Sequence, residues 1–263
     1  MSRIADRLAA LKAEGRKGLI IYITAGAPDF TATLQAVKAA EAAGADIIEL
    51  GIPFSDPMAD GPVIQKAAML ALKSGASTAK IAELVRQIRE SSQIPLAAMT
   101  YINSVLNFGE AEFAAEFRQA GLDGLIVPDL PSEEADGLEG ICRACGLDFI
   151  QFVAPTTDAG RVSNICSKAS GFIYCVSTTG VTGVRQVDYG SIGAVMNTVR
   201  SHTAVPLAIG FGIGTPAAAK AAAEYADAVI VGSAVMQALM DEGAEAVGAL
   251  VKSIRQALDE GVR

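Results

Sequence analysis

The sequence contains no tryptophan, only one histidine and only four cysteines among its 263 residues. A lone histidine cannot form a His-rich metal site, and His202 precedes an expected strand, which speaks against a Ser-His-Asp triad. Cys142 and Cys145 form a CxxC pair, but it lies in a helix-like stretch far from any second cysteine pair, so zinc and redox chemistry are disfavoured. Carboxylates must therefore carry any acid–base chemistry, and we expect no metal.

Clustered positive charge and long apolar runs are also missing. The net charge is −8, and no basic cluster is longer than the Arg16-Lys17 pair, so we expect no binding to nucleic acid or to an anionic membrane. Uncharged runs such as 203–219 are broken by Gly and Pro, which speaks against a membrane span. The first 17 residues have helical spacing and carry acids among their bases, unlike a targeting peptide, so we expect a cytoplasmic protein.

The chain is instead rich in alternating short apolar runs and stretches with helical periodicity. No linker, charge block or low-complexity segment divides it, so we expect one domain over residues 1–263. Parallel strands need helical crossovers, and eight such units predict an α/β fold, a closed (β/α)8 TIM barrel with an extra N-terminal helix at its bottom. The expected strands are 18–24, 46–50, 95–101, 123–127, 147–153, 171–177, 205–210 and 227–232, and the expected helices are 29–43, 62–91, 109–120, 131–145, 158–168, 189–201, 215–224 and 233–259.

Two carboxylates stand at the ends of one loop, ELGIPFSDPMADGP at 49–62. Glu49 ends an apolar strand, and the prolines and glycines that follow prevent regular structure until after Asp60. An acid in an apolar strand end has its pKa raised by desolvation, whereas we expect the loop acid to lie in a wetter place and to stay ionised. The pair could divide acid and base roles, or both acids could be ordinary cap and turn residues.

Reacting groups in such barrels lie where strands end. Tyr22, Tyr101, Asp129 and Tyr174 satisfy this rule, whereas His202 belongs at the opposite end. Asp129 could equally cap a helix that begins near Ser132, and the tyrosines could be wall residues.

Glycine clusters follow the last three expected strands: GVTG at 180–183, GFGIG at 210–214 and Gly232-Ser233. A phosphate needs several backbone N–H groups without a Cβ in the way, preferably at a helix N-terminus. Apart from Arg185 these loops have no basic residue, so the sequence predicts a phosphate site made of amides and helix dipoles.

These motifs together, with YITAG at 22–26 and VPDLP at 127–131, resemble the tryptophan synthase alpha chain family over the whole length. The resemblance implies retro-aldol cleavage of indole-3-glycerol phosphate to indole and D-glyceraldehyde 3-phosphate. It implies no cofactor in this chain and a PLP-containing beta chain as the partner, in an alpha2-beta2 heterotetramer.

The resemblance also implies roles for single residues. Glu49 would be the general acid/base, Asp60 would hold the indole N–H, and Tyr174 would be a positioning residue at the active site. Ile21-Tyr22 departs from the Pro-Phe that family members often have, so the packing above the indole ring differs. The implied phosphate contacts are Gly183, Gly212, Gly232 and Ser233, and the implied indole-pocket or lid residues are Tyr22, Ile64, Met99, Ile126 and Thr182.

Other functions remain open at this point. A free-standing indole-releasing lyase would share every catalytic residue and lack only the partner surface. A sugar-phosphate isomerase or flavin enzyme would use the same phosphate cradle without this acid pair, and a non-catalytic barrel could activate a partner through its loops.

Overall fold

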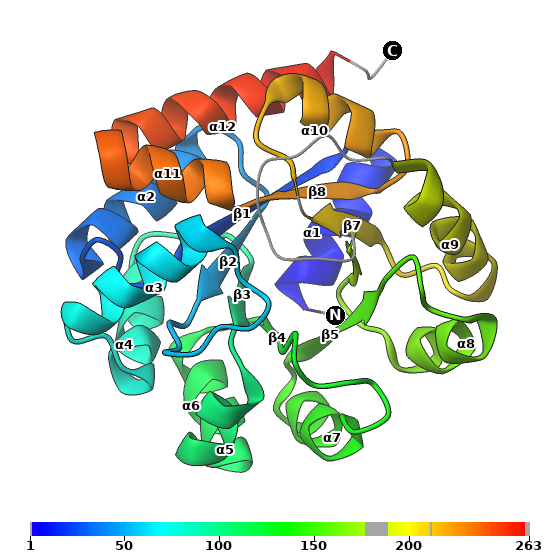
Figure 1. The fold of residues 1–263 in the computed structure, drawn as a ribbon, viewed down its shortest axis with the longest axis horizontal. Helices are drawn as coiled ribbons and strands as arrows, with labels where there is room; N and C mark the ends of the chain where they lie inside the picture. Colours follow the sequence, from blue (N-terminus) through cyan, green and yellow to red (C-terminus); the bar gives the residue numbers. More distant parts are fainter. Residues whose placement is uncertain (1, 177–188, 211, 261–263) are drawn as a thin grey trace.

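Eight parallel strands form a closed barrel in the computed structural model, which describes residues 2–176, 189–210 and 212–260 (Figure 1). Each strand pairs with the next along the chain, and β1 closes the ring against β8. The strands are β1 (Gly18–Thr24), β2 (Ile47–Gly51), β3 (Leu96–Met99), β4 (Gly124–Ile126), β5 (Asp148–Val153), β6 (Ile173–Val176), β7 (Leu207–Gly210) and β8 (Ala228–Val231). The predicted barrel is confirmed.

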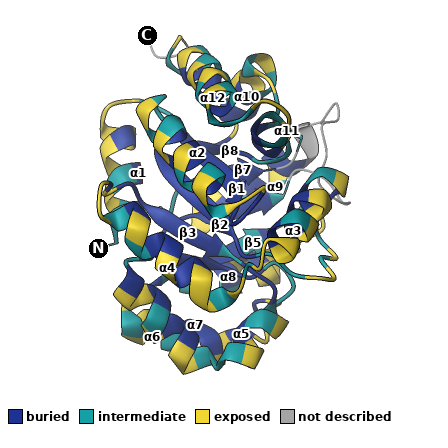
Figure 2. Cartoon of the chain, turned by 90° about the vertical axis from the view of Figure 1, so that its left-hand side faces the viewer, coloured by how far each residue is buried: buried dark blue, intermediate teal, exposed yellow. Residues whose placement is uncertain are grey.

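Helices surround this barrel and bury its strands on their outer side (Figures 1 and 2). Both faces of a parallel sheet are covered in this way, which explains why the strands read as nearly continuous apolar runs. The helices are α1 (Arg3–Ala13), α2 (Phe30–Ala42), α3 (Pro62–Lys73), α4 (Thr78–Arg89), α5 (Ile102–Phe108), α6 (Glu110–Ala120), α7 (Asp136–Cys145), α8 (Ala159–Lys168), α9 (Tyr189–His202), α10 (Pro216–Ala223), α11 (Ser233–Glu242) and α12 (Ala244–Asp259).

The first helix, α1, plugs one end of the barrel, as the sequence predicted (Figure 2). Its apolar residues Ile4, Leu8 and Leu11 are buried and belong to the same interior cluster as Ile20 and Ile230. The Ser2 hydroxyl caps the helix by accepting the backbone N–H of Ala5. The end of the barrel where the strands begin is thus closed, and a site can open only where they end.

Aspartates that directly precede strands stabilise this closed end. Asp46 precedes β2, accepts the backbone N–H of Leu19 in β1 at 2.8 Å, and pairs with the guanidinium groups of Arg7 and Arg255. The same arrangement recurs at Asp123, which accepts the N–H at the start of β3, and at Asp227, which accepts the N–H at the start of β7. Each carboxylate accepts a backbone N–H at the start of a strand, a donor that would otherwise lack a partner, and an arginine balances its charge.

Some element boundaries differ from the predicted ones. The predicted helix 62–91 is two helices, because Gly75 has φ +82° and the chain turns before α4. The predicted helix 233–259 is likewise interrupted at Gly243, which has φ +90°. Helix α5 was not predicted, and the predicted helix 131–145 begins only at Asp136.

Asp129 caps a different helix from the one expected. Its Oδ1 accepts the backbone N–H of Ile102 at the start of α5, at 2.9 Å. The interpretation that Asp129 caps a helix near Ser132 is therefore wrong. The Asp129 side chain instead reaches the N-terminus of α5, which follows the neighbouring strand β3.

In the described part of the chain, no helix is both long and apolar enough to cross a bilayer.

Candidate active site

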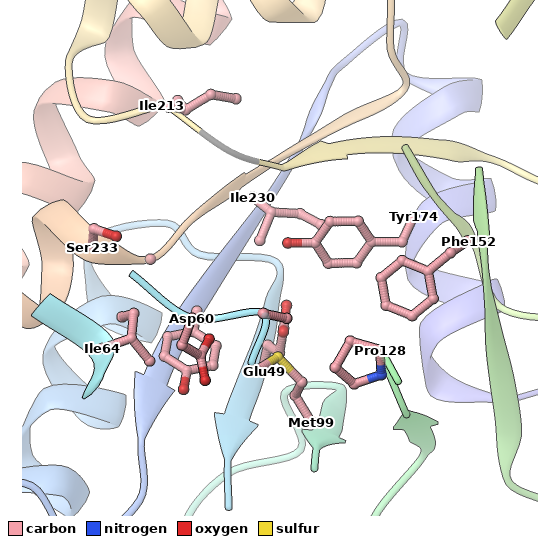
Figure 3. A pocket seen from close by; sticks show the side chains of 14 residues that line it. Glu49, Asp60, Ile64, Met99, Pro128, Phe152, Tyr174, Ile213, Ile230 and Ser233 are labelled. Atoms are coloured by element: carbon pink, nitrogen blue, oxygen red, sulfur yellow. The ribbon is translucent and has the colours of Figure 1, made fainter. Parts of the chain in front are cut away.

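A pocket opens at the end of the barrel where the strands finish, opposite α1 (Figure 3). It contains about 680 Å³ of space, a volume that includes open solvent at its mouth. Two carboxyl groups, an apolar and aromatic wall, and a glycine-rich rim meet in it. The lining residues are Tyr22, Glu49, Ala59, Asp60, Ile64, Met99, Pro128, Phe152, Tyr174, Gly212, Ile213, Ile230, Gly232 and Ser233.

Glu49 is the buried acid of this pocket. It lies on β2, level with Tyr22 on β1 and Ala97 on β3, so its side chain points into the barrel. The residue is 1% exposed, and its Oε2 has no hydrogen-bond partner among the residues that the structure describes. Burial, together with the nearby charge of Asp60, raises the pKa of Glu49 to about 8. At neutral pH this carboxyl therefore carries a proton that it can give to a bound molecule.

Asp60 comes from the loop after β2, and it is also buried. Only 5% of the residue is exposed, so the expectation that the loop acid lies in a wetter place is wrong. The Tyr101 hydroxyl donates to Asp60 Oδ2 at 3.0 Å, and the Gln65 amide donates to the Asp60 backbone carbonyl at 2.8 Å. Burial raises the pKa of Asp60 to about 6, and the hydrogen bond from Tyr101 opposes that rise. Asp60 is therefore mostly ionised at neutral pH, as predicted.

The wall opposite the two acids is aromatic (Figure 3). Tyr174 on β6 stacks on Phe152 of β5 with ring centroids 5.0 Å apart. Tyr174 extends across the next strand, since a Cβ added at Gly210 would lie 2.3 Å from its hydroxyl oxygen. Burial raises the pKa of Tyr174 well above its usual value, so this phenol stays neutral. A flat apolar ring fits between such a wall and the carboxyl pair.

Tyr22 forms a second phenol contact of the same kind. A Cβ at Gly51, the last residue of β2, would lie 2.0 Å from the Tyr22 hydroxyl oxygen, so a larger residue there would displace the Tyr22 ring. Thr24 donates a hydrogen bond to this hydroxyl at 3.2 Å. The hydroxyl that the sequence introduces at position 22 thus has a partner within the barrel.

The rim on the side of β7 and β8 is made of small residues. Gly212 has φ +76°, a backbone conformation that favours glycine. Gly232 is the N-cap of α11, Ser233 is its first residue, and both line the pocket, so the N-terminus of α11 lies at the rim. None of the described lining residues is Lys or Arg. An anion at this rim would be held by amides and by the helix dipole.

Most of the residues predicted for the site meet in this one pocket: Tyr22, Glu49, Asp60, Ile64, Met99, Tyr174, Gly212, Gly232 and Ser233. Ile126 does not line it and is buried in the barrel interior. Thr182 and Gly183 lie outside the described residues, as does the rest of the GVTG segment. The two acids, the aromatic wall and the glycine-rich rim come from strands and loops spread around the whole barrel, and they meet in this pocket.

Sequence reasoning missed five lining residues, namely Ala59, Pro128, Phe152, Ile213 and Ile230. Phe152 and Ile230 could have been predicted from the sequence, because each lies two residues after another inward-facing residue of its strand. Pro128 and Ile213 follow strand ends, where loop conformation decides what faces inward, and no periodicity reveals that.

Comparison with known proteins gives one consistent result. The sequence profile of the family described as "Tryptophan synthase alpha chain" matches residues 8–261. The tryptophan synthase alpha chain of Citrifermentans bemidjiense is 46% identical over the full length of both chains, and that of Gluconacetobacter diazotrophicus is 50% identical over 92% of this chain and 88% of its own. Among solved structures, the tryptophan synthase subunit alpha of Legionella pneumophila superposes with a TM-score of 0.91 at 38% identity, covering 99% of each chain.

Proposed function

Because the chain belongs to the tryptophan synthase alpha chain family, we propose that the two buried acids of its pocket carry out the cleavage of indole-3-glycerol phosphate. The chain is a carbon–carbon lyase of tryptophan biosynthesis, and it releases indole and D-glyceraldehyde 3-phosphate. What remains to be assigned is the role of each residue. The observation that carries our assignment is that two buried carboxyl groups, Glu49 and Asp60, line one pocket at the end of the barrel where the strands finish.

Glu49 acts as the general acid and then as the general base. Breaking the bond between indole and the glycerol chain requires a proton on the ring carbon, and protonated Glu49 supplies it. The resulting carboxylate then accepts the proton of the glycerol hydroxyl, and the carbon that bears this hydroxyl becomes the aldehyde carbon of D-glyceraldehyde 3-phosphate. Glu49 ends the cycle protonated, so the step needs no outside proton. Its Oε2, which accepts no hydrogen bond from any described residue, is the atom available for both transfers.

Asp60 holds the indole N–H. Protonation of the ring carbon develops positive charge on the ring nitrogen, and an ionised carboxylate beside that nitrogen stabilises it. Asp60 has the right charge state, because its pKa of about 6 keeps it mostly ionised at pH 7. Tyr174 and Phe152 form the wall on which the indole ring lies, and Gly212, Gly232 and Ser233 hold the phosphate.

Indole release by the purified chain tests these roles. We expect Glu49→Gln and Asp60→Asn each to reduce kcat by about 100-fold or more, with both variants still folded. Gly232→Asp should raise KM for the phosphorylated substrate, because it places a negative charge at the rim. Undiminished release by either acid variant would refute the assigned role, and an unchanged KM would remove the rim from the phosphate site.

The family assignment also implies partnership with a tryptophan synthase beta chain, and the structural relatives include the tryptophan synthase of Mycobacterium tuberculosis at a TM-score of 0.91. The finer proposal is an alpha2-beta2 heterotetramer whose beta chain holds the PLP, with no cofactor in this chain. Met58, Met69 and Leu106 are large apolar side chains exposed on segments that follow β2 and β3, and they support a docking surface there.

Mixing the chain with a tryptophan synthase beta chain tests the partnership. We expect a complex of two copies of each chain in light scattering and faster indole formation than by the chain alone. A chain that remains alone and keeps the same rate would favour the free-standing lyase.

A further inference from the structure

Asp60 is carried by a segment that cannot position it unaided. Prolines and glycines make the loop irregular from Pro53 to Gly61, and Ser55, Asp56 and Met58 are exposed. The loop nevertheless returns to the barrel at Asp60 with 5% exposure. A catalytic carboxylate must be held within a fraction of an ångström, so its position has to be imposed by a neighbouring rigid element.

Tyr101 provides that element. It follows β3, is 2% exposed, and does not line the pocket itself. Its hydroxyl accepts the backbone N–H of Ala59 at 2.9 Å and donates to Asp60 Oδ2 at 3.0 Å. Phe54, earlier in the same loop, stacks on the Tyr101 ring with centroids 5.3 Å apart. One side chain thus contacts the loop at three points.

The direction of these bonds matters. A phenol has a single proton, and Ala59 N–H can only donate, so the hydroxyl proton is left for the carboxylate of Asp60. Burial raises the pKa of Tyr101, so the phenol remains a neutral donor at physiological pH. A donor of this kind favours the ionised carboxylate.

We propose that Tyr101 is a positioning residue for the lyase reaction, which fixes the loop after β2 and donates the hydrogen bond that keeps Asp60 ionised and aimed at the indole N–H. This inference rests on the proposed role of Asp60. The positioning function is attributed to the Tyr101 hydroxyl, whereas the Tyr101 ring only stacks on Phe54. A mutation that removes the hydroxyl and keeps the ring can therefore separate the two.

Tyr101→Phe is the test, because it keeps the ring that Phe54 stacks on and removes only the hydroxyl. Loss of the donor raises the pKa of Asp60 from about 6, so the acidic limb of the kcat/KM profile should move to higher pH by about one unit. Relative to the parent, activity should fall about fivefold at pH 6, about twofold at pH 7, and little at pH 8.

A second readout does not depend on turnover. Carboxyl carbon NMR of the ligand-free chain should show Asp60 titrating about one unit higher in Tyr101→Phe. The other titratable groups that act on Asp60 or Tyr101 are common to parent and variant, so the difference isolates the hydroxyl. These groups are Tyr22 on β1, Glu49 on β2, Asp129 after β4 and Tyr174 on β6.

Two control variants separate the carboxylate bond from general loosening. Gln65→Leu removes the bond to the Asp60 backbone carbonyl and should leave the acidic limb in place. Tyr225→Phe makes the same chemical change at an exposed tyrosine between α10 and β8 and should leave the acidic limb in place. A lower rate in Tyr101→Phe with an unmoved limb and an unmoved Asp60 titration would overturn the proposal. Full activity in Asp60→Asn would instead overturn the role of Asp60, whatever Tyr101→Phe does.

Discussion

Replacing Glu49 by glutamine should stabilise the folded chain, and the gain should grow with pH. The native pKa of Glu49 is about 8, well above the 4.5 of an unburied glutamate. Between these values the native chain holds a proton that the unfolded chain has lost, so stability falls as pH rises through this window and levels off above pH 8. Glutamine has nearly the same shape and no charge, so it removes this loss.

The size of the effect follows from the two pKa values. Each pH unit within the window is worth about 1.4 kcal/mol. Between pH 5 and pH 8 the stability difference between Glu49→Gln and the parent should therefore change by about 3 kcal/mol in favour of glutamine. Asp60 also has a raised pKa, but it is present in both chains and largely cancels in the comparison.

Urea unfolding of both chains at pH 5 and pH 8, followed by circular dichroism, measures this difference. Glu224→Gln, at the exposed C-cap of α10, is the matched control, because it makes the same chemical change at a surface position. A Glu49→Gln variant that is no more stabilised at pH 8 than at pH 5 would show that Glu49 is not a desolvated acid. The gain in stability should accompany loss of indole release, because the group that destabilises the fold is the one that transfers the proton.

Three further outcomes are expected. Asp60→Asn removes a negative charge that raises the pKa of Glu49, so the basic limb of its residual kcat/KM profile should move to lower pH; a limb that stays in place would mean that the two acids are not coupled. Gly51→Ala places a Cβ 2.0 Å from the Tyr22 hydroxyl, so we expect the free energy of unfolding in urea to fall by about 1–3 kcal/mol and KM to rise. Adding Tyr22→Leu should restore the stability but not the KM. Asp46→Ala removes the acceptor of the Leu19 N–H and the carboxylate that pairs with Arg7 and Arg255, so the free energy of unfolding should fall by about 3 kcal/mol. We expect kcat to stay unchanged, because this network lies at the end of the barrel opposite the pocket.

The barrel could be predicted because its signal is local. Apolar runs and helical stretches alternate eight times, and β1 begins and ends at the predicted residues, Gly18 and Thr24. The helix breaks at Gly75 and Gly243 were missed because the periodicity resumes on either side of a single left-handed residue. Helix α5 was missed because it is short and its first turn is capped by Asp129, a residue 27 positions further along the chain.

The candidate site was predicted in part for the same reason. Glu49 could be placed because strand ends meet at one edge of the barrel. The burial of Asp60 could not be predicted, since it depends on Tyr101, which lies 41 residues away and comes from another strand end. Ile126 ends its strand as Met99 does, but only Met99 lines the pocket, and the outline of a cavity depends on all its walls at once.

The seal that α1 forms at the barrel base has a consequence for synthesis of the chain. Ile4 belongs to the same interior cluster as Ala228 and Ile230 of β8, so α1 is packed together with the strand of the barrel that is synthesised more than 200 residues later. Until β8 emerges and pairs with β1, the apolar face of α1 lacks its final partners. Nascent chains that stop short of residue 228 should therefore expose this face and depend on chaperones, and closure of the barrel must await the synthesis of β8.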